Sequence, residues 1–485
     1  MNGERLKNFV DGAWVDSSGT AITDVKNPAT GKTLALTPMS TAGDVDQAVR
    51  AAQAAFPSWR ATPPVQRARY LFKLKTLLDE NKEEIGRICT QEHGKTLAEA
   101  VNDIGRGIEN VEHACGTPSL MMGASLEDVS AGIDTASWRQ PMGVFAAITP
   151  FNFPPMVPLW FLPYAVATGN TFVLKPSEQV PLSQRKIFEL IERAGFPKGV
   201  INLVNGGKEV VESFCTHELI QGVSFVGSTK IAKLVYETAS RNGKRVQSLG
   251  GAKNFLLIDD TAVMEQAIQN ACDSGYGCAG QRCLAGSTVV AIGSAYDRVR
   301  ELMVKFTNNV VVGDGLDAKT TMGPVISLQA KERIAHMIQK GVDEGAELLV
   351  DGRGYIPPAG YEGGYWLGPS LFDKVKPHMA IAQQEIFGPV INLMQAATLE
   401  EGIALMNSVP YANAGSLYTS SGKAARQFKQ TAHPAMLGVN IGVAAPMAFF
   451  PFGGAKQSMF GDVKAHGPDA IQFYTDRKVV MSRWF

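Results

Sequence analysis

Two short apolar runs, GVFAAIT at residues 143–149 and TFVLK at residues 171–175, decide the fold of this 485-residue chain. Runs of this length and composition are typical of strands that are buried on both faces of a sheet. The 35 residues from Gln140 to Leu174 carry no charge, but six prolines interrupt them. A membrane-spanning helix is therefore excluded, and we expect a buried strand, a turn and a buried helix.

Strands and helices alternate along the chain beyond these two runs. We predict strands at 200–204, 222–226, 255–258 and 287–292, and helices at 183–194, 208–216, 230–240, 264–274 and 296–308. Alternation in units of roughly 25–30 residues indicates parallel, doubly wound sheets. Because a second series begins after Gly250, we predict an α/β fold with two doubly wound parallel-sheet domains and a cleft between them. The segments 127–138 and 471–484 are expected to form a hairpin excursion and a strand.

Composition excludes several classes of protein. The chain has 46 Lys+Arg against 46 Asp+Glu, so nothing in its net charge favours a nucleic-acid partner. Hydrophobic residues make up 45% and charged residues 19%, which is wrong for a disordered chain. Six cysteines are too few for a disulfide scaffold, and we expect a reduced, cytoplasmic protein.

A nucleotide site is expected where the strands of the first series end. The chain has no G-x-G-x-x-G after a strand, but it has Lys175-Pro176-Ser177-Glu178. The Lys and Ser can bind a ribose or phosphate, and the Glu can bind a ribose diol and repel a 2′-phosphate, so NAD is favoured over NADP. The run FVGST at 225–229 opens a helix, where a pyrophosphate can rest. The alternative for either motif alone is an ordinary β–α turn.

The segment 277–283 reads GCAGQRC and is the strongest local signal. Its cysteines and Cys272 contain no C-x-x-C pair and have no histidine within 50 residues, so we predict no metal site. Cys283 is a candidate nucleophile because the charge of the adjacent Arg282 favours a thiolate. The alternative is a structural cysteine.

Seven segments, in chain order, resemble the aldehyde dehydrogenase superfamily. They are TPFNFP (149–154), KPSE (175–178), FVGST (225–229), LGGAKN (249–254), GQRC (280–283), EIFGP (385–389) and PFGG (451–454). The resemblance implies that Cys283 attacks an aldehyde, and that the Asn152 side chain and the backbone N–H of Cys283 form the oxyanion hole. It also implies that the first domain is an atypical Rossmann domain that binds NAD. The implied NAD-binding residues are Thr149, Phe151, Lys175, Ser177, Glu178, Gly227, Ser228, Gly250, Glu385 and Phe387, with Lys175 and Glu178 at the adenosine ribose and Glu385 at the nicotinamide ribose.

One residue departs from the family pattern. Most members have a glutamate that opens a Glu-Leu-Gly-Gly-Lys motif and activates the water that hydrolyses the thioester. Alignment on the lysine places Leu249 there, and alignment on Leu-Gly-Gly places Ser248 there, so neither register supplies a carboxylate.

Within the superfamily, residues 137–154, 169–178, 251–254 and 280–283 and the C-terminal segments are similar to CoA-acylating methylmalonate-semialdehyde dehydrogenases. This resemblance implies NAD-dependent oxidation of methylmalonate or malonate semialdehyde through a thioester on Cys283. Acyl transfer to coenzyme A with decarboxylation would then give propionyl-CoA or acetyl-CoA. One alternative is a hydrolytic, non-acylating NAD-dependent dehydrogenase of another acidic semialdehyde, and another is a non-catalytic member of the family.

An acidic substrate needs a cation in the site. The resemblance points to Arg106 and Arg282 as the groups that bind the substrate carboxylate, since a guanidinium suits a carboxylate better than an ammonium does. The alternative for Arg106 is a surface or interdomain ion pair. We expect Phe153, Trp160 and Phe449 to line the acyl pocket.

The resemblance also sets the expected domain limits. Residues 1–123 and 143–249 are expected to form the NAD-binding domain and 250–448 the catalytic domain, with 449–464 returning to the NAD-binding domain. Residues 124–142 and 465–485 are expected to be oligomerisation strands that form a β-hairpin arm. We therefore predict a homo-oligomer, a tetramer or a dimer.

Overall fold

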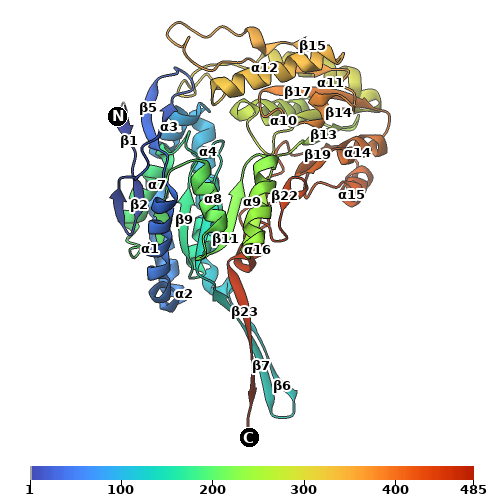
Figure 1. The fold of residues 1–485 in the computed structure, drawn as a ribbon. Coiled ribbons are helices and arrows are strands. Elements are labelled where there is room, and N and C mark those ends of the chain that lie inside the picture. Colours follow the sequence, from blue (N-terminus) through green and yellow to red (C-terminus); the bar gives the residue numbers. More distant parts are fainter. Residues whose placement is uncertain (1–2) are drawn as a thin grey trace.

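Two large sheets flanked by helices form the body of the protein, in a computed structural model that describes residues 3–485 (Figure 1). The first sheet has the order β22-β12-β11-β8-β9-β10-β2-β3, and its five central strands, from β12 to β10, run parallel. Its strands are β22 (Met459–Phe460), β12 (Arg245–Leu249), β11 (Ile220–Val226), β8 (Val144–Ile148), β9 (Thr171–Lys175), β10 (Ile201–Leu203), β2 (Asn8–Val10) and β3 (Ala13–Val15).

The first sheet is buried on both faces, as the apolar run at residues 143–149 predicts. Along β8, Phe145 and Ala147 pack into one apolar core, and Val144, Ala146 and Ile148 pack into the other. The helices that cover the two faces are α1 (Ala42–Ala61), α2 (Pro64–Glu80), α3 (Lys82–His93), α4 (Leu97–Cys115), α5 (Thr117–Leu120), α6 (Leu162–Ala167), α7 (Leu182–Ala194), α8 (Lys208–Thr216) and α9 (Thr229–Arg241).

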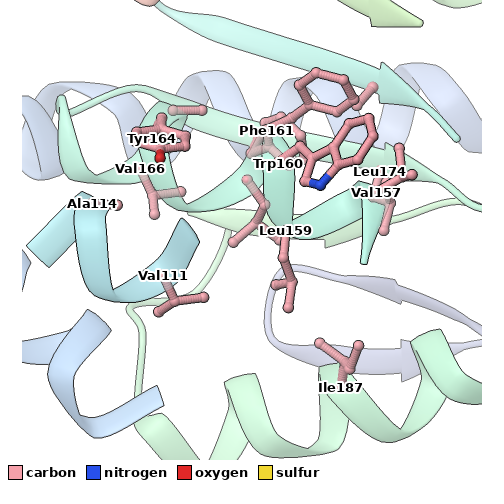
Figure 2. Packing of buried hydrophobic residues seen from close by; sticks show 14 of the residues in the cluster. Val111, Ala114, Val157, Leu159, Trp160, Phe161, Tyr164, Val166, Leu174 and Ile187 are labelled. Carbon is pink, nitrogen blue, oxygen red and sulfur yellow. The ribbon is translucent and has the colours of Figure 1, made fainter. Parts of the chain in front are cut away.

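The uncharged stretch 140–174 lies deep in this body. It forms β8, the short 3₁₀ helix η1 (Val157–Trp160), α6 and β9. Figure 2 shows Leu159, Trp160 and Phe161 of this stretch in one packed cluster with Val111 of α4 and Ile187 of α7. None of the helices within residues 3–485 has the length and apolar character needed to cross a membrane.

The second sheet has the order β15-β16-β17-β14-β13-β19-β20, and only its edge strand β15 is antiparallel to its neighbour among the described strands. The strands are β13 (Phe255–Ile258), β14 (Thr288–Ile292), β15 (Glu347–Val350), β16 (Ser370–Asp373), β17 (Val390–Ala396), β19 (Ala414–Tyr418) and β20 (Met436–Val439). The helices around it are α10 (Met264–Tyr276), α11 (Tyr296–Asn308), α12 (Leu328–Asp343), α13 (Ala380–Gln383), α14 (Leu399–Ser408) and α15 (Gly422–Thr431). This sheet has an apolar core of its own.

Two small sheets complete the body. One joins β1 (Glu4–Arg5), β4 (Ile22–Lys26) and β5 (Thr33–Pro38), and the other pairs β18 (Tyr411–Ala412) with β21 (Ala455–Lys456). The two parallel sheets confirm the predicted fold class. The predicted domain limits stay predictions, and the first two residues of the first segment lie outside the described part.

A three-stranded arm projects from the body, with the C-terminus at its tip (Figure 1). It consists of β6 (Ala124–Ser130), β7 (Ile133–Pro141) and β23 (Thr475–Arg483), in the order β23-β7-β6. The expectation that all of 465–485 is strand was wrong, because residues 467–473 form helix α16 (Gly467–Phe473). Pro468 favours a helix start, and α16 buries Ala470, Ile471 and Phe473 in the core of the first sheet.

Candidate active site

The loop that carries Cys283 follows α10 and has an unusual backbone. Cys278, Ala279 and Gly280 have φ values of 50°, 52° and 69°, all in the left-handed region. A Cβ atom at Gly280 would lie 2.0 Å from the carbonyl oxygen of Gly388. Glycine is therefore required at 280, where the GQRC segment contacts the EIFGP segment at 385–389.

Two asparagines fix the position of the nucleophile. The Nδ2 atoms of Asn254 and Asn413 each donate to the carbonyl oxygen of Cys283 at 2.9 Å. All six cysteines lie in the described part of the chain, and Cys283 is the one that is not fully buried. The thiol of Cys283 is thus both anchored and accessible.

Asn152 lies beside this loop, as the oxyanion-hole expectation requires. It is 4% exposed, and its Nδ2 donates to the carbonyl oxygen of Gln281, two residues before Cys283, at 2.9 Å. This bond uses one amide hydrogen, so the other is left for a substrate oxygen.

A buried lysine binds the backbone of Asn152. Lys95 Nζ donates to the carbonyl oxygen of Asn152 at 2.7 Å, forms an ion pair with Asp103 and lies 4.2 Å from the centre of the Phe153 ring. Burial opposes the charge of Lys95, but Asp103 raises its pKa, so the ammonium stays protonated.

Glu99 connects the start of α4 to the catalytic loop. Its Oε2 accepts the backbone N–H of Thr96 at 3.0 Å, which completes a capping box. Its Oε1 accepts the backbone N–H of Cys278 at 2.8 Å and Nη2 of Arg282 at 2.8 Å. Sequence reasoning missed Lys95, Glu99 and Asp103, although the spacing of four residues between Glu99 and Asp103 could have revealed a common face of α4.

A cavity of about 380 Å³ opens above Cys283 and brings several of the predicted residues together. Its lining includes Cys283, Arg106, Arg282, Phe153 and Trp160, together with Asn102, Asp103, Asn110, Met156, Leu284, Val443, Ala445, Pro446, Phe452 and His466. The expectation for Phe449 was wrong: it is 52% exposed, lies outside this lining and packs on Phe450 and His113. Phe452, three residues later, occupies the wall instead.

Both arginines of the cavity are paired with glutamates of α4. Arg106 Nη1 donates to Glu109 at 2.7 Å and its Nη2 donates to the carbonyl oxygen of Pro446 at 2.7 Å. Arg282 is paired with Glu99. Arg106 therefore forms an ion pair and also lines the cavity, so the two interpretations offered by the sequence both apply to its position.

The charge of Arg282 acts on Cys283 in the expected direction, toward the thiolate, but other effects outweigh it. Burial raises the pKa of Cys283 to about 12, the charge of Glu385 adds to the shift, and Arg282 opposes it only weakly. The physical reason is that Glu99 already neutralises Arg282.

The register of the LGGAKN segment is clear in the structure. Ser248 Oγ donates to the carbonyl oxygen of Ala232 in α9 at 2.7 Å, on one face of the first sheet. Leu249 faces the other way, in the apolar cluster that includes Leu284 and borders Cys283. Of these two residues of β12, Leu249 is therefore the one on the face covered by the core that Cys283 borders, and neither supplies a carboxylate.

A second cavity, of about 330 Å³, lies next to the end of β9. Phe151, Ser177, Glu178 and Phe387, all expected to bind NAD, are part of its lining. Lys175, at the end of β9, donates from Nζ to Glu178 at 3.1 Å, and its carbonyl oxygen accepts the N–H of Thr149 at 3.0 Å. These side chains supply the donors and acceptors that a ribose needs.

The turn before α9 has room for an anionic group. Ser228 does not cap the helix with its side chain, so the first amides of α9 keep their hydrogens free of a side-chain partner within the described chain. A Cβ at Gly227 would lie 2.6 Å from the Phe225 ring, and one at Gly250 would lie 2.9 Å from the carbonyl oxygen of Gln457.

Glu385 is held by the backbone of the LGGAKN segment. Its Oε1 accepts the N–H of Ala252 at 3.0 Å, and a Cβ at Gly251 would lie 2.4 Å from its Oε2. Burial raises the pKa of Glu385 to about 7 and lowers the pKa of Lys253 to about 7. With ribose-binding groups near Lys175, an uncapped helix start and a carboxylate near Cys283, the site fits a dinucleotide such as NAD.

Two doubly wound sheets, a partly exposed cysteine beside a buried amide donor and groups suited to a dinucleotide are the combination expected of a nicotinamide-dependent dehydrogenase. The model of the aldehyde dehydrogenase family matches residues 14–480, and the chain belongs to this family.

Similar proteins cover the whole chain. A malonate-semialdehyde dehydrogenase of Bacillus cereus (strain AH187) is 48% identical over 482 residues, which is 99% of each protein. The crystal structure of methylmalonate-semialdehyde dehydrogenase from Oceanimonas doudoroffii is 43% identical, with a TM-score of 0.97, and the match covers 100% of this chain and 99% of that one. A proposed methylmalonate-semialdehyde dehydrogenase from Sinorhizobium meliloti 1021, solved with NAD, is 42% identical, with a TM-score of 0.98 and coverage of 99% and 98%.

Proposed function

We propose that this protein oxidises malonate semialdehyde or methylmalonate semialdehyde with NAD and passes the acyl group from Cys283 to coenzyme A. The substrate carboxylate leaves as CO₂, so the products are acetyl-CoA or propionyl-CoA, CO₂ and NADH. The names of the relatives support the substrate class. The observation that carries the acyl acceptor is that neither Ser248 nor Leu249, at the end of β12, supplies a carboxylate that could activate water.

The geometry supports the following sequence of events. Cys283 loses its proton and its sulfur attacks the aldehyde carbon, and the resulting oxyanion accepts hydrogen bonds from Asn152 Nδ2 and the N–H of Cys283. NAD held by Lys175, Glu178 and Glu385 would supply the hydride acceptor that the change from this adduct to a thioester needs. Attack by the thiol of coenzyme A then breaks the bond to Cys283 and returns the cysteine.

Loss of the substrate carboxylate as CO₂ completes the atom and electron balance of the reaction. The carbon–carboxylate bond breaks in the acyl group, its electron pair stays on the carbon next to the thioester, and that carbon takes up one proton. One semialdehyde anion, one NAD⁺ and one CoA thiol thus yield one acyl-CoA, one CO₂ and one NADH. A leucine in place of a general base fits this route because coenzyme A supplies its own nucleophile.

The test is NADH formation from each semialdehyde with coenzyme A present and absent, followed by mass spectrometry of the products. We expect acetyl-CoA or propionyl-CoA and slow turnover without coenzyme A. The Cys283→Ala variant should form no NADH. Equally fast turnover without coenzyme A, with free acid as product, would contradict the proposed acyl acceptor.

A hydrolytic dehydrogenase of an acidic semialdehyde is the second candidate. Glu385 favours it, because its raised pKa of about 7 is suited to a general base and its charge acts on Cys283. Reaction in ¹⁸O-labelled water distinguishes the two candidates, since only hydrolysis places the label in a free-acid product.

A further inference from the structure

His466 is a polar residue in the wall of the substrate cavity that the proposed reaction does not yet use. It is 3% exposed and lies just before α16, in the lining that also contains Arg106 and Cys283. Its backbone has φ of 69°, in the left-handed region that most side chains avoid.

The backbone around His466 is held in this strained conformation from both sides. Ala465 and Phe452 exchange two backbone hydrogen bonds, at 2.7 and 3.0 Å, and the N–H of Gly467 donates to the carbonyl oxygen of Ala448 at 3.0 Å. Strain that the surroundings enforce in this way concentrates at functional sites.

Aromatic rings hold the imidazole in place. The Trp160 ring lies 4.9 Å away at an interplanar angle of 81°, and the Phe452 ring lies 5.3 Å away. Within residues 3–485, neither Nδ1 nor Nε2 of His466 has a hydrogen-bond partner. Burial, with the charges of Arg106 and His113, lowers the pKa of His466 to about 3, so the ring is neutral and carries one N–H donor.

Glutamates of the protein neutralise most of the positive charge in the cavity. Arg106 is paired with Glu109 and Arg282 with Glu99. A substrate carboxylate in this cavity therefore gains from a further donor that carries no counter-ion of its own.

We propose that His466 binds the substrate carboxylate, by donating a hydrogen bond from its neutral ring to the carboxylate oxygen beside Arg106. The inference rests on the proposed function and adds a specificity residue to it. An aldehyde without a carboxylate leaves the buried N–H without a partner, so the site discriminates against it.

The experiment compares malonate semialdehyde with propanal, which has a methyl group in place of the carboxylate. His466→Phe keeps an aromatic ring but removes the donor, and His466→Asn keeps a donor and tolerates the left-handed backbone. We expect His466→Phe to lower kcat/KM for malonate semialdehyde about tenfold or more, mainly through KM, and to leave kcat/KM for propanal unchanged or higher. His466→Asn should retain most of the activity with malonate semialdehyde.

Two results would overturn the inference. One is an equal fractional loss for both substrates in His466→Phe, which would mean that the ring only supports the fold of the site. The other is an unchanged kcat/KM for both substrates, which would mean that the ring does not bind the carboxylate. Either is distinct from failure of the proposed function, which would show as no oxidation of malonate or methylmalonate semialdehyde by the unmodified protein. Thermal denaturation of both variants identifies any loss of folding.

Discussion

Cys283 combines a fixed backbone with a thiol that is mostly protonated. Its carbonyl oxygen accepts two asparagine amides, while burial raises its pKa to about 12. Because Glu99 neutralises Arg282, deprotonation must come from binding of substrate and cofactor rather than from a permanent neighbouring cation.

Alkylation of the unliganded protein tests whether the Cys283 thiol is protonated. The thiolate is the reactive form, so a raised pKa means that the rate of reaction of Cys283 with iodoacetamide increases about tenfold for each pH unit between roughly pH 7 and 9, without a plateau. The measurement is labelling of Cys283 over time by mass spectrometry, with Cys283→Ala as the control for labelling at other sites. A plateau below pH 8 would show that the thiolate is already stabilised.

We expect the residue at position 249 to determine whether water can accept the acyl group from Cys283. Leu249→Glu places a carboxylate at the end of β12, on the face covered by the core that Cys283 borders, and we expect it to raise turnover without coenzyme A by at least about tenfold, since a general base contributes about 10²–10⁴-fold. The isosteric Leu249→Gln lacks the base and is the matched control. If the two variants hydrolyse the thioester equally slowly, the leucine does not set the acyl acceptor.

Helix α4 is the element that assembles the site. From its first turn onward it presents Glu99 to the catalytic loop, Asp103 to Lys95 and Arg106 to the cavity. These contacts link one helix to Asn152 on the first sheet and to the nucleophile loop that leads into the second.

Variants of the Lys95–Asp103 pair can distinguish its role in orienting Asn152 from its contribution to the stability of the fold. Lys95→Met leaves Asp103 buried without a partner, which costs about 3–5 kcal/mol of unfolding free energy. We expect the double variant Lys95→Met/Asp103→Leu to recover most of that stability in urea denaturation. Its kcat should stay about 10–100-fold low, because Asn152 has lost the donor that orients its backbone. A double variant with normal kcat would show that the pair serves folding alone.

The sequence predicts the parallel sheets well because strands buried on both faces need continuous apolar runs. β9, α8, β13 and α11 begin and end at the predicted residues. It fails at 467–473, since Ile471 and Phe473 alternate like a strand, and only the core around them makes a helix of this segment.

Site residues that belong to a sequence motif could be predicted. Residues whose place in the site depends on packing could not. Cys283, Arg106, Arg282 and Phe153 line one cavity, whereas Phe449 gives way to Phe452. His466 could not be found from the sequence, because an imidazole without partners is defined by the groups around it. The same holds for the choice between Ser248 and Leu249, which depends on the face of β12 that each occupies.

At the scale of the whole molecule, the chain has as many acidic as basic residues, so no net charge draws its anionic ligands to it. The proposed substrate, NAD and coenzyme A are all anions and must be bound by local groups. Lys175 at the end of β9 and Asn152 in the loop after β8 belong to the part built on the first sheet, and Arg282, Cys283 and Glu385 lie in loops that lead into β14 and β17 of the second.

The arm carries several exposed apolar side chains, and our prediction of a homo-oligomer rests on it. Trp138, Val479, Met481 and Trp484 are between 52% and 75% exposed on strands β7 and β23 and at the chain end just beyond β23. Exposed apolar groups on a sheet with open edges indicate a protein partner.

We expect light scattering at micromolar concentration to give a dimer or tetramer, and Val479→Glu/Met481→Glu to give a smaller species with unchanged circular dichroism. Lys478→Gln, on the opposite face of β23, is the matched control and should leave the assembly intact. A wild-type monomer, or a double variant that assembles normally, would remove the arm as the interface.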